Sequence, residues 1–320
     1  MGNHFCCVSN SQNSEFSSSK TIGQITYKSN NFQLIYFNIE KNKIISLKVN
    51  LRILTSLKGI SQINSEEGYI YLCGNNNDSI LPNLLFGSYL IKLKIIENNI
   101  DTQLLINSRS PHYNPSLILN KKYLFVIGGK KQTKCELYNL ELNKWKEVRN
   151  LPEERYKCSL LIDRNNEYLY CFGGVYTKNK FEGNYSILKL NINKVLYQWE
   201  RIMINENYNL LYRYSAACFK NNDSNFIYII GGKNVSFNQK NNNKLLNDVI
   251  IYDCFCKVIK SSNIKLQKEC KFQNKYGLCF HQNQFFFIDS ESNVHFINLE
   301  TKQSDILQLK EEKNSYLNTV

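Results

Sequence analysis

The sequence predicts an all-β protein built from one structural unit that is repeated about six times. Three observations predict it: apolar, β-rich runs that end in glycine, a tyrosine step before these runs, and a polar anchor after them. The stretch 123–145, YLFVIGGKKQTKCELYNLELNKW, holds the clearest copy. Because two strands and a tight turn cannot bury a face alone, we expect the unit to recur.

Each unit is expected to contain a strand that ends at a glycine pair. Tyr123 to Ile127 is such a run, and it stops at Gly128-Gly129, where glycine tolerates a positive φ and a close backbone approach. CFGG at 171–174 and IIGG at 229–232 repeat the pattern, and LCGN at 72–75 and TIGQ at 21–24 are weaker copies with one glycine each. These strands give the first register of the repeat.

A polar anchor gives the second register. In YNLELNKW, Asn139 precedes Trp145 by six residues, Asn143-Lys144 turns the chain before the tryptophan, and five other segments echo this pattern. The six anchors are Asn38, Lys94, Asn139, Asn191, Asp253 and Asn298. They recur every 45 to 62 residues, which sets the length of one unit.

A tyrosine step gives the third register. A basic or polar residue, then Tyr, then a small residue three positions further on, precedes the glycine-bearing strand. The steps are His112-Tyr113 with Ser116, Arg155-Tyr156 with Ser159, Arg213-Tyr214 with Ala217, Lys275-Tyr276 with Cys279, and Ser315-Tyr316 with Thr319. A glycine-pair strand, then Tyr, then Trp, at about 50 residues per unit, resembles the kelch repeat. The resemblance covers roughly residues 20–320 and implies a six-bladed kelch-type β-propeller.

The chain divides into residues 1–20, a Ser/Asn-rich arm that we expect to be flexible, and residues 21–320, the propeller. Residues 21–50 provide three strands with no inner strand before them, and the inner-strand register reappears only at 315–320. We therefore expect the C-terminal strand to close the first blade, which removes two exposed strand edges. The other blades are predicted at about 51–106, 107–150, 151–204, 205–262 and 263–313.

The N-terminal arm carries features of a lipid anchor. Gly2 is the residue that N-myristoylation requires, although Cys6 stands where the usual motif has Ser or Thr. Cys6 and Cys7 lie where palmitoyl chains are added in dual-acylated proteins, and a second chain is what makes such anchoring stable. The alternative is a disordered N-terminus with an incidental glycine and two thiols.

Composition excludes several function classes. The net charge is +13, but the lysines are scattered among asparagines without a basic block, so we do not expect nucleic acid as a partner. The eleven cysteines are odd in number, and several occupy apolar strand positions (Cys73, Cys171 and Cys279), which favours buried thiols over disulfides. No apolar run approaches the roughly 20 residues that span a bilayer.

We expect no catalytic residue, no metal and no cofactor. The four histidines (His4, His112, His281 and His295) lie far apart in the sequence, apart from the last two, and none forms a short-range pair at ligand spacing. The glycine pairs end strands without a following helix, which is typical of turns and not of phosphate loops. The kelch resemblance keeps one alternative open, an enzyme such as a copper oxidase or a sugar isomerase.

A binding face is the remaining candidate. In the propeller that the resemblance implies, the inner strands begin at one mouth of the central channel, where this chain has His112, Arg155, Arg213 and Lys275. Some kelch propellers use arginines near this position to hold acidic peptide segments by pairing with carboxylates. The alternative is that the step belongs to the repeat itself, with Tyr packing between blades and the basic residue pairing with neighbouring loops.

The sequence therefore predicts a non-catalytic protein-interaction module, either an adaptor or a structural scaffold. We expect it in the cytoplasm, and on the cytoplasmic face of a membrane if the arm is acylated. A soluble component of a cytoskeletal or ciliary assembly is a further interpretation, and the oligomeric state is left open.

Overall fold

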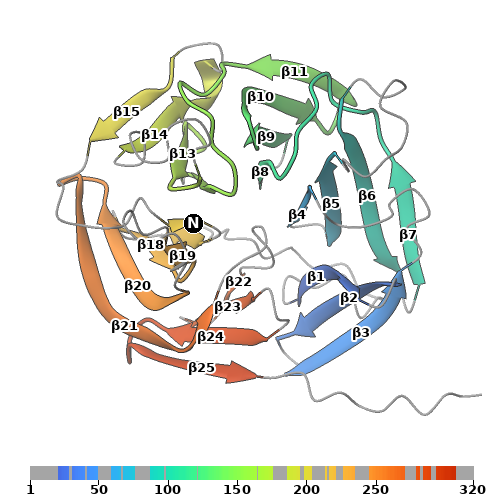
Figure 1. Ribbon diagram of the computed structural model, residues 1–320. Coiled ribbons are helices and arrows are strands. Elements are labelled where there is room, and N and C mark those ends of the chain that lie inside the picture. Colours follow the sequence, from blue (N-terminus) through green and yellow to red (C-terminus); the bar gives the residue numbers. More distant parts are fainter. Residues whose placement is uncertain are drawn as a thin grey trace, which may run out of the picture.

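The strands form antiparallel sheets that stand around a central axis, as in a β-propeller (Figure 1). The computed structural model describes residues 21–28, 31–39, 42–49, 59–65, 68–75, 87–96, 99–120, 122–163, 165–175, 186–194, 198–203, 213–214, 216–220, 226–234, 245–270, 279–281, 284–289 and 293–307. No α-helix occurs in these ranges, and the one 3₁₀ turn covers Ile192–Lys194. The all-β prediction is confirmed.

Five sheets are four-stranded blades, named here by their strands. The first two, from the innermost to the outermost strand, are β4 (Ile60–Asn64), β5 (Tyr69–Gly74), β6 (Tyr89–Ile96) and β7 (Asn99–Leu104), and β8 (Ser116–Leu119), β9 (Tyr123–Gly129), β10 (Gln132–Asn139) and β11 (Lys144–Val148). The third is β12 (Ser159–Ile162), β13 (Tyr168–Phe172), β14 (Ser186–Asn191) and β15 (Glu200–Met203). The last two are β17 (Ala217–Lys220), β18 (Phe226–Ile230), β20 (Leu246–Asp253) and β21 (Val258–Cys270), and β22 (Cys279–His281), β23 (Gln284–Ile288), β24 (Val294–Asn298) and β25 (Gln303–Leu307).

Two smaller sheets complete the described part. One is three-stranded and contains β1 (Thr21–Lys28), β2 (Asn31–Asn38) and β3 (Lys43–Val49); β1 packs beside β4 and β23. The other pairs β16 (Arg213–Tyr214) with β19 (Lys233–Asn234). The prediction of six blades is therefore corrected to five four-stranded blades in the described residues. The segment 315–320, which we expected to close the first blade, lies outside the described residues.

The core lies between neighbouring blades. On β9, Phe125 and Ile127 pack against the blade β12–β15, whereas Leu124 and Val126 point to the opposite face, toward the blade β4–β7. Successive strand residues point to opposite sides of a sheet, and here both sides are covered. This explains why the run YLFVI is apolar at every position instead of alternating.

Small hydroxyl side chains tie three inner strands, β4, β8 and β12, to the next blade. Ser61 Oγ donates to the carbonyl oxygen of Pro115 (2.6 Å), Ser116 Oγ to that of Cys158 (2.8 Å), and Ser159 Oγ to that of Ala216 (2.5 Å). Each bond joins equivalent positions of consecutive blades, and all three are buried. Two of the donors are the small residues of the predicted tyrosine steps.

The outer strands repeat a second inter-blade bond. Trp145 Nε1 donates to the carbonyl oxygen of Ile106, and Trp199 Nε1 donates to that of Arg149, both at 2.8 Å. Ile106 and Arg149 each follow the outer strand of the preceding blade. The two tryptophans of the chain therefore hold the ring together near its rim.

Most of the predicted anchors form the same turn. The side-chain oxygens of Asn139, Asp253 and Asn298 each accept hydrogen bonds from two backbone amides that follow, and that of Asn191 accepts one. The residue four positions after the anchor takes a left-handed φ of 48° to 58° at Asn42, Asn143, Lys257 and Lys302. The short side chain of Asn or Asp stabilises such turns by bonding the local backbone.

Lys94 does not follow this rule. It lies inside β6, opposite Asp101, and the hairpin turn comes two residues later, after Ile96. A lysine has no acceptor with which to cap a turn, so the strand continues past it. The register of the anchor is nevertheless the same, because Lys94 pairs with Tyr69, the first residue of β5, as Asn139 pairs with Tyr123, the first residue of β9.

The strand β21 is longer than predicted. It runs to Cys270, beyond the expected limit of 262, and its second half stays paired with β20 at Lys265 and Cys270 while it also lies against β25. There Ser304 Oγ donates to the carbonyl oxygen of Lys265 (2.7 Å), and Gln267 Nε2 donates to that of Ser304 (3.1 Å). Ile264 and Leu266 pack with Phe285 and other apolar residues of the blade β22–β25.

We predict that Ser159→Ala lowers the free energy of unfolding by about 1–2 kcal/mol, because it removes the donor for a buried carbonyl at a blade junction. The matched control is Ser46→Ala at an exposed position of β3, for which we expect a change within about 0.5 kcal/mol. Urea unfolding followed by tryptophan fluorescence measures both. Equal midpoints for the two variants would contradict a stabilising role for the inter-blade bond.

Candidate functional site

The tyrosine step pairs with the residue that follows the glycine pair of the same blade. The amide of Lys130 donates to the carbonyl oxygen of Tyr113 (2.8 Å), and Tyr156 and Val175 form an antiparallel bridge. In the next blade Tyr214 pairs with Lys233 in the short sheet β16–β19. The backbone of the step therefore occupies equivalent places in three consecutive blades.

His112 is buried and fully engaged within its blade. Nδ1 lies 2.7 Å from the carbonyl oxygen of Gly128, and Nε2 lies 3.0 Å from Oε2 of Glu136. A carbonyl oxygen and a carboxylate can only accept hydrogen bonds. The ring therefore bridges the first glycine of the pair and the carboxylate of β10.

Arg155 occupies the equivalent position in the next blade. Its Nη1 donates to the carbonyl oxygen of Gly173 (3.4 Å), just as His112 bonds to Gly128. Its Nε donates to Oε1 of Glu153 at 3.0 Å, and Nη2 bonds the same oxygen. The other oxygen of Glu153 accepts from Arg201, a partly exposed residue of β15. Arg155 itself has no exposed surface.

The structure thus places two of the four predicted partner-binding residues inside the fold. His112 and Arg155 are both 0 % exposed, so in this structure neither side chain can touch a partner directly. Their contacts match the alternative that the basic residue belongs to the repeat. For Arg213 only the backbone is described, in β16, and Lys275 lies outside the described residues, as do Gly2, Cys6 and Cys7. Partner binding and acylation at these positions stay predictions.

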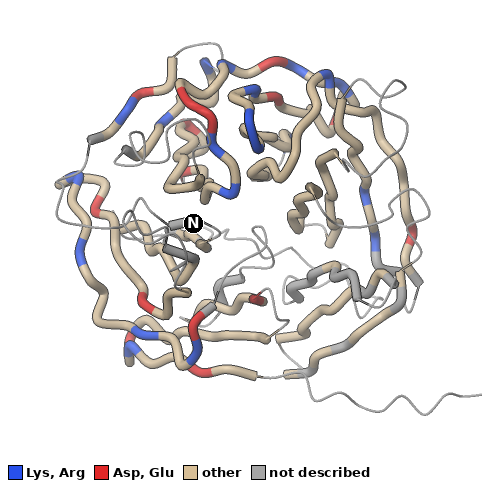
Figure 2. The backbone as a smooth tube through the Cα atoms, viewed as in Figure 1, with Lys and Arg blue, Asp and Glu red and all other residues tan. Residues whose placement is uncertain are grey.

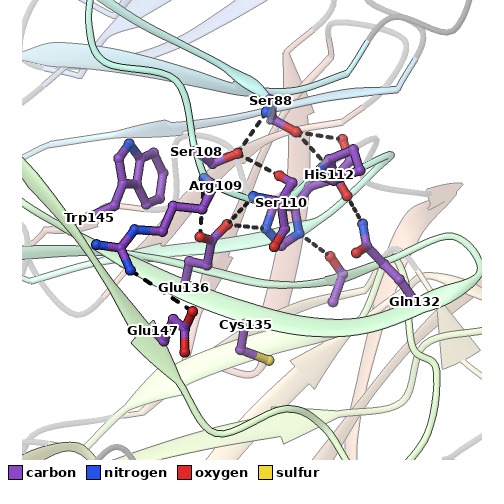
Figure 3. A network of polar contacts seen from close by, with 12 residues as sticks. Ser88, Ser108, Arg109, Ser110, His112, Gln132, Cys135, Glu136, Trp145 and Glu147 are labelled. Carbon is purple, nitrogen blue, oxygen red and sulfur yellow. Dashed lines mark hydrogen bonds and ion pairs between the residues drawn. The ribbon is translucent and has the colours of Figure 1, made fainter. Parts of the chain in front are cut away.

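Glu136 is a central residue that sequence reasoning missed. Besides His112, its carboxylate accepts from the backbone amides of Arg109 (3.2 Å) and Ser110 (3.1 Å), so it fixes the loop that enters the blade (Figure 3). The sequence signal was a single acid in the apolar run CELY on β10. A charge is rarely buried without a partner, but that partner lies 24 residues away and has no local signature.

Serine side chains extend this network toward the blade β4–β7. The amide of Ser88 donates to Ser108 Oγ (2.7 Å), Ser108 Oγ donates to the carbonyl oxygen of Ser110 (2.6 Å), and the amide of His112 donates to Ser88 Oγ (2.5 Å) (Figure 3). Gln132 Nε2 also bonds the carbonyl oxygen of Pro111. Residues 108–112 are therefore held on both sides.

A groove lies above this network, across the end of the blade β8–β11. It consists of two adjoining hollows of about 510 and 320 Å³ that share Ser110 and Lys134. The larger is lined by residues 110–111, 131–134 and 152–154, and the smaller by 110, 134–136 and 147–150. We call these two hollows the blade groove. It follows the β9–β10 turn to the end of β11 and meets the loop that leads to β12.

The thiols serve packing. Cys73, Cys135, Cys158, Cys171 and Cys218 are buried and not in disulfides, which confirms the prediction for Cys73 and Cys171. Burial raises the pKa of Cys135 to about 12, and a hydrogen bond with Cys158, together with burial, raises the pKa of Cys171. These thiols are therefore protonated at neutral pH and are poor nucleophiles. The side chain of Cys279 is not among those described.

Metal ligands are not gathered in the described part of the chain: no three or more His, Cys, Asp or Glu side chains there are arranged to hold an ion. His295 donates from Nε2 to the buried carboxylate of Asp289 at 2.9 Å, and Asn293 also bonds this carboxylate. Burial works to raise the pKa of Asp289, but its hydrogen bonds with His295 and Asn293 outweigh that effect and lower it. This cluster ties the strands β23 and β24 together.

Comparison with known proteins adds no family. No protein-family model matches the chain, and no curated protein matches it. Within the described residues, no helix is long and apolar enough to cross a membrane.

We predict that Glu136→Ala lowers the free energy of unfolding by about 3 kcal/mol or more, because it leaves a buried ring nitrogen of His112 and two loop amides without their partner. Glu147→Ala, at the penultimate residue of β11, is the control: its side chain is 73 % exposed and its pair with Arg109 spans 3.9 Å. We expect about 0.5 kcal/mol or less there. Thermal and urea unfolding would contradict the role of Glu136 if both variants behaved alike.

Proposed function

We propose that this protein is a non-catalytic protein-interaction module, an adaptor or scaffold built on a kelch-type propeller. The observation that carries the proposal is that the repeated residues build the frame of the ring, whereas its loops are not repeated. The groups that recur from blade to blade, which are side chains at the tyrosine steps and tryptophans and backbone carbonyls at the glycine pairs, make their contacts within the ring. A rigid frame of this kind presents its non-repeated loops for recognition.

Three repeated contacts support the kelch-type assignment. The residue before Tyr bonds the first glycine of the pair, a small residue at the start of the inner strand bonds the next blade, and the tryptophan bonds the preceding one. Each contact joins residues that define one register of the repeat. A polypeptide that merely contained β-hairpins would have no reason to place them at equivalent positions.

Charge also favours recognition through loops over binding along the whole surface. Figure 2 shows Lys and Arg around the described part of the ring, interspersed with Asp and Glu and without one continuous basic face. Such a distribution offers local charged sites, and it lacks the clustered basic stripe that is typical of nucleic-acid binding.

We further propose that the module is tethered to the cytoplasmic face of a membrane by acyl chains on Gly2 and on Cys6 or Cys7. A folded ring with a lipid arm would place its loops at a membrane and recruit a partner there. Two chains are needed because a single myristoyl group gives only marginal binding.

The test of both proposals is affinity purification of the full-length protein from the membrane and cytosolic fractions of its native cells. We expect a protein partner in stoichiometric amount, found in the membrane fraction with wild type and shifted to the cytosol with Gly2→Ala. The intact mass should show an acyl increment, part of it sensitive to hydroxylamine. A partner that stays with cytosolic, unacylated protein would refute the tether alone, and the absence of any partner would refute the module.

The first blade adds a structural proposal, that residues 315–320 form the inner strand beside β1. The sheet β1–β3 has three strands where the blades have four, and Asn38 ends β2 at the place where Asn139 ends the third strand of its blade. The missing position is therefore the innermost one.

Deleting residues 315–320 should then lower the free energy of unfolding by about 2 kcal/mol or more, because it uncovers a strand edge and apolar surface. Deletion of residues 1–20 is the control, and it should leave stability unchanged, as expected for an arm that buries little. Urea unfolding compares the two. A C-terminal deletion that unfolds like the full chain would rule out closure by this segment.

A further inference from the structure

The blade groove is lined by positive side chains that have no partner among the described residues. Lys131, Lys134 and Arg149 are exposed, and no ion pair or hydrogen bond of their charged groups occurs in the described part of the chain. They come from the β9–β10 turn, from β10 and from the segment after β11. Three segments thus direct unneutralised charge to one concave surface.

The carboxylates along the same groove, by contrast, have partners. Glu136 is buried and bound by His112 and two backbone amides, Glu153 lies between two arginines, and Glu147 pairs with Arg109. Glu154 also lines the larger hollow and has a contact of its own. Since Glu136 and Glu153 are bound by contacts within the fold, the exposed cations face a ligand in the groove.

The turn that carries Lys131 adds a second observation. Lys131 has a φ of 65°, a left-handed conformation that glycine and asparagine adopt more readily than lysine. Two other exposed lysines, Lys257 and Lys302, have the same backbone conformation in turns of other blades, far from the groove. They provide controls with the same residue type, charge and backbone geometry.

From these observations we propose that the blade groove binds a carboxylate-rich, extended peptide segment of a partner protein. Lys131, Lys134 and Arg149 pair with its Asp or Glu side chains, and Arg149 offers two parallel donors to one carboxylate. Polar groups at Ser110, Thr133 and Asn150 lie alongside and suit the peptide backbone. This inference rests on the proposed function as an interaction module and names where, and with what chemistry, that module binds.

The groove, and not the mouth of the channel, is the acidic-peptide site that the described residues support. The basic residues expected at the mouth, His112 and Arg155, spend their donors on glycine carbonyls and glutamates inside the ring. The side-chain hydrogen-bond donors of Lys131, Lys134 and Arg149 in the groove are not used by any described residue. Its lining contains no aromatic residue on which a base could stack, which favours a peptide over a single-stranded nucleic acid.

The test is direct binding of a fluorescein-labelled hexaglutamate peptide to the full-length protein, measured by fluorescence anisotropy. The groove variant is Lys131→Asn, Lys134→Gln and Arg149→Gln together, in which asparagine keeps the left-handed turn. The matched control is Lys257→Asn, Lys302→Asn and Lys265→Gln, which removes the same charge from exposed positions elsewhere. Circular dichroism and urea unfolding verify that both variants fold.

We expect the groove variant to bind hexaglutamate at least about tenfold more weakly than wild type, and the control variant to bind within about twofold of it. Equal weakening of both would show that the net charge of the chain, and not the groove, attracts the peptide, and would overturn the proposal. The proposal would also be overturned if the wild-type protein did not bind hexaglutamate, or bound only a phosphoserine peptide of the same length.

Failure here is distinguishable from failure of the module itself. A cellular partner that copurifies equally with wild type and the groove variant would leave the interaction module standing and refute the groove as its site. Loss of that partner from the groove variant alone supports both. Absence of any partner from wild type refutes the module, and hexaglutamate binding still decides whether the groove takes carboxylates.

Discussion

The glycine pair is the constraint on which the rest of the ring depends. At Gly128 the φ is 62°, and a side chain there would begin 2.3 Å from the carbonyl oxygen of Arg155 in the next blade. The carbonyl of Gly128 accepts from His112 in its own blade, while the amide of Gly129 donates to that same oxygen of Arg155 at 3.0 Å. One dipeptide thus ends a strand, fixes the entering loop and joins two blades, which only residues without Cβ allow.

Much of this could be predicted because it depends on local sequence. The side chains of the Asn and Asp anchors cap turns by accepting hydrogen bonds from the amides that follow them. The strand YLFVI is apolar throughout, which indicates that it is buried on both faces. What could not be predicted depends on contacts between residues that lie far apart in the sequence. Glu136 meets His112 across 24 residues, and the path of β21 is set by Ser304, 39 residues from Lys265. The blade count differs for a related reason: β1–β3 shows three strands in the described residues, and the fourth that repeat counting takes from the far end of the chain lies outside them.

The candidate site shows how a correct pattern can suggest the wrong role. The basic residue before each tyrosine does recur, as the sequence indicated, and its recurrence reflects the need of each blade for a donor beneath its glycine turn. Residues that differ between blades are better guides to recognition, because the frame does not prescribe them. Lys131, Lys134 and Arg149 occupy no register of the repeat, and in the blade groove they are exposed cations without an ion pair among the described residues.

The long strand β21 changes how the ring can come apart. In a ring of separate blades each sheet could in principle open alone, but β21 stays paired with β20 along its length, and its second half also joins the apolar packing and hydrogen bonds of the next blade. The strand β21 therefore links the blades β17–β21 and β22–β25 through one continuous piece of backbone. Amide protons along both should exchange with solvent as one cooperative unit, so this side of the ring behaves as a single rigid wall, and flexing is left to the other junctions.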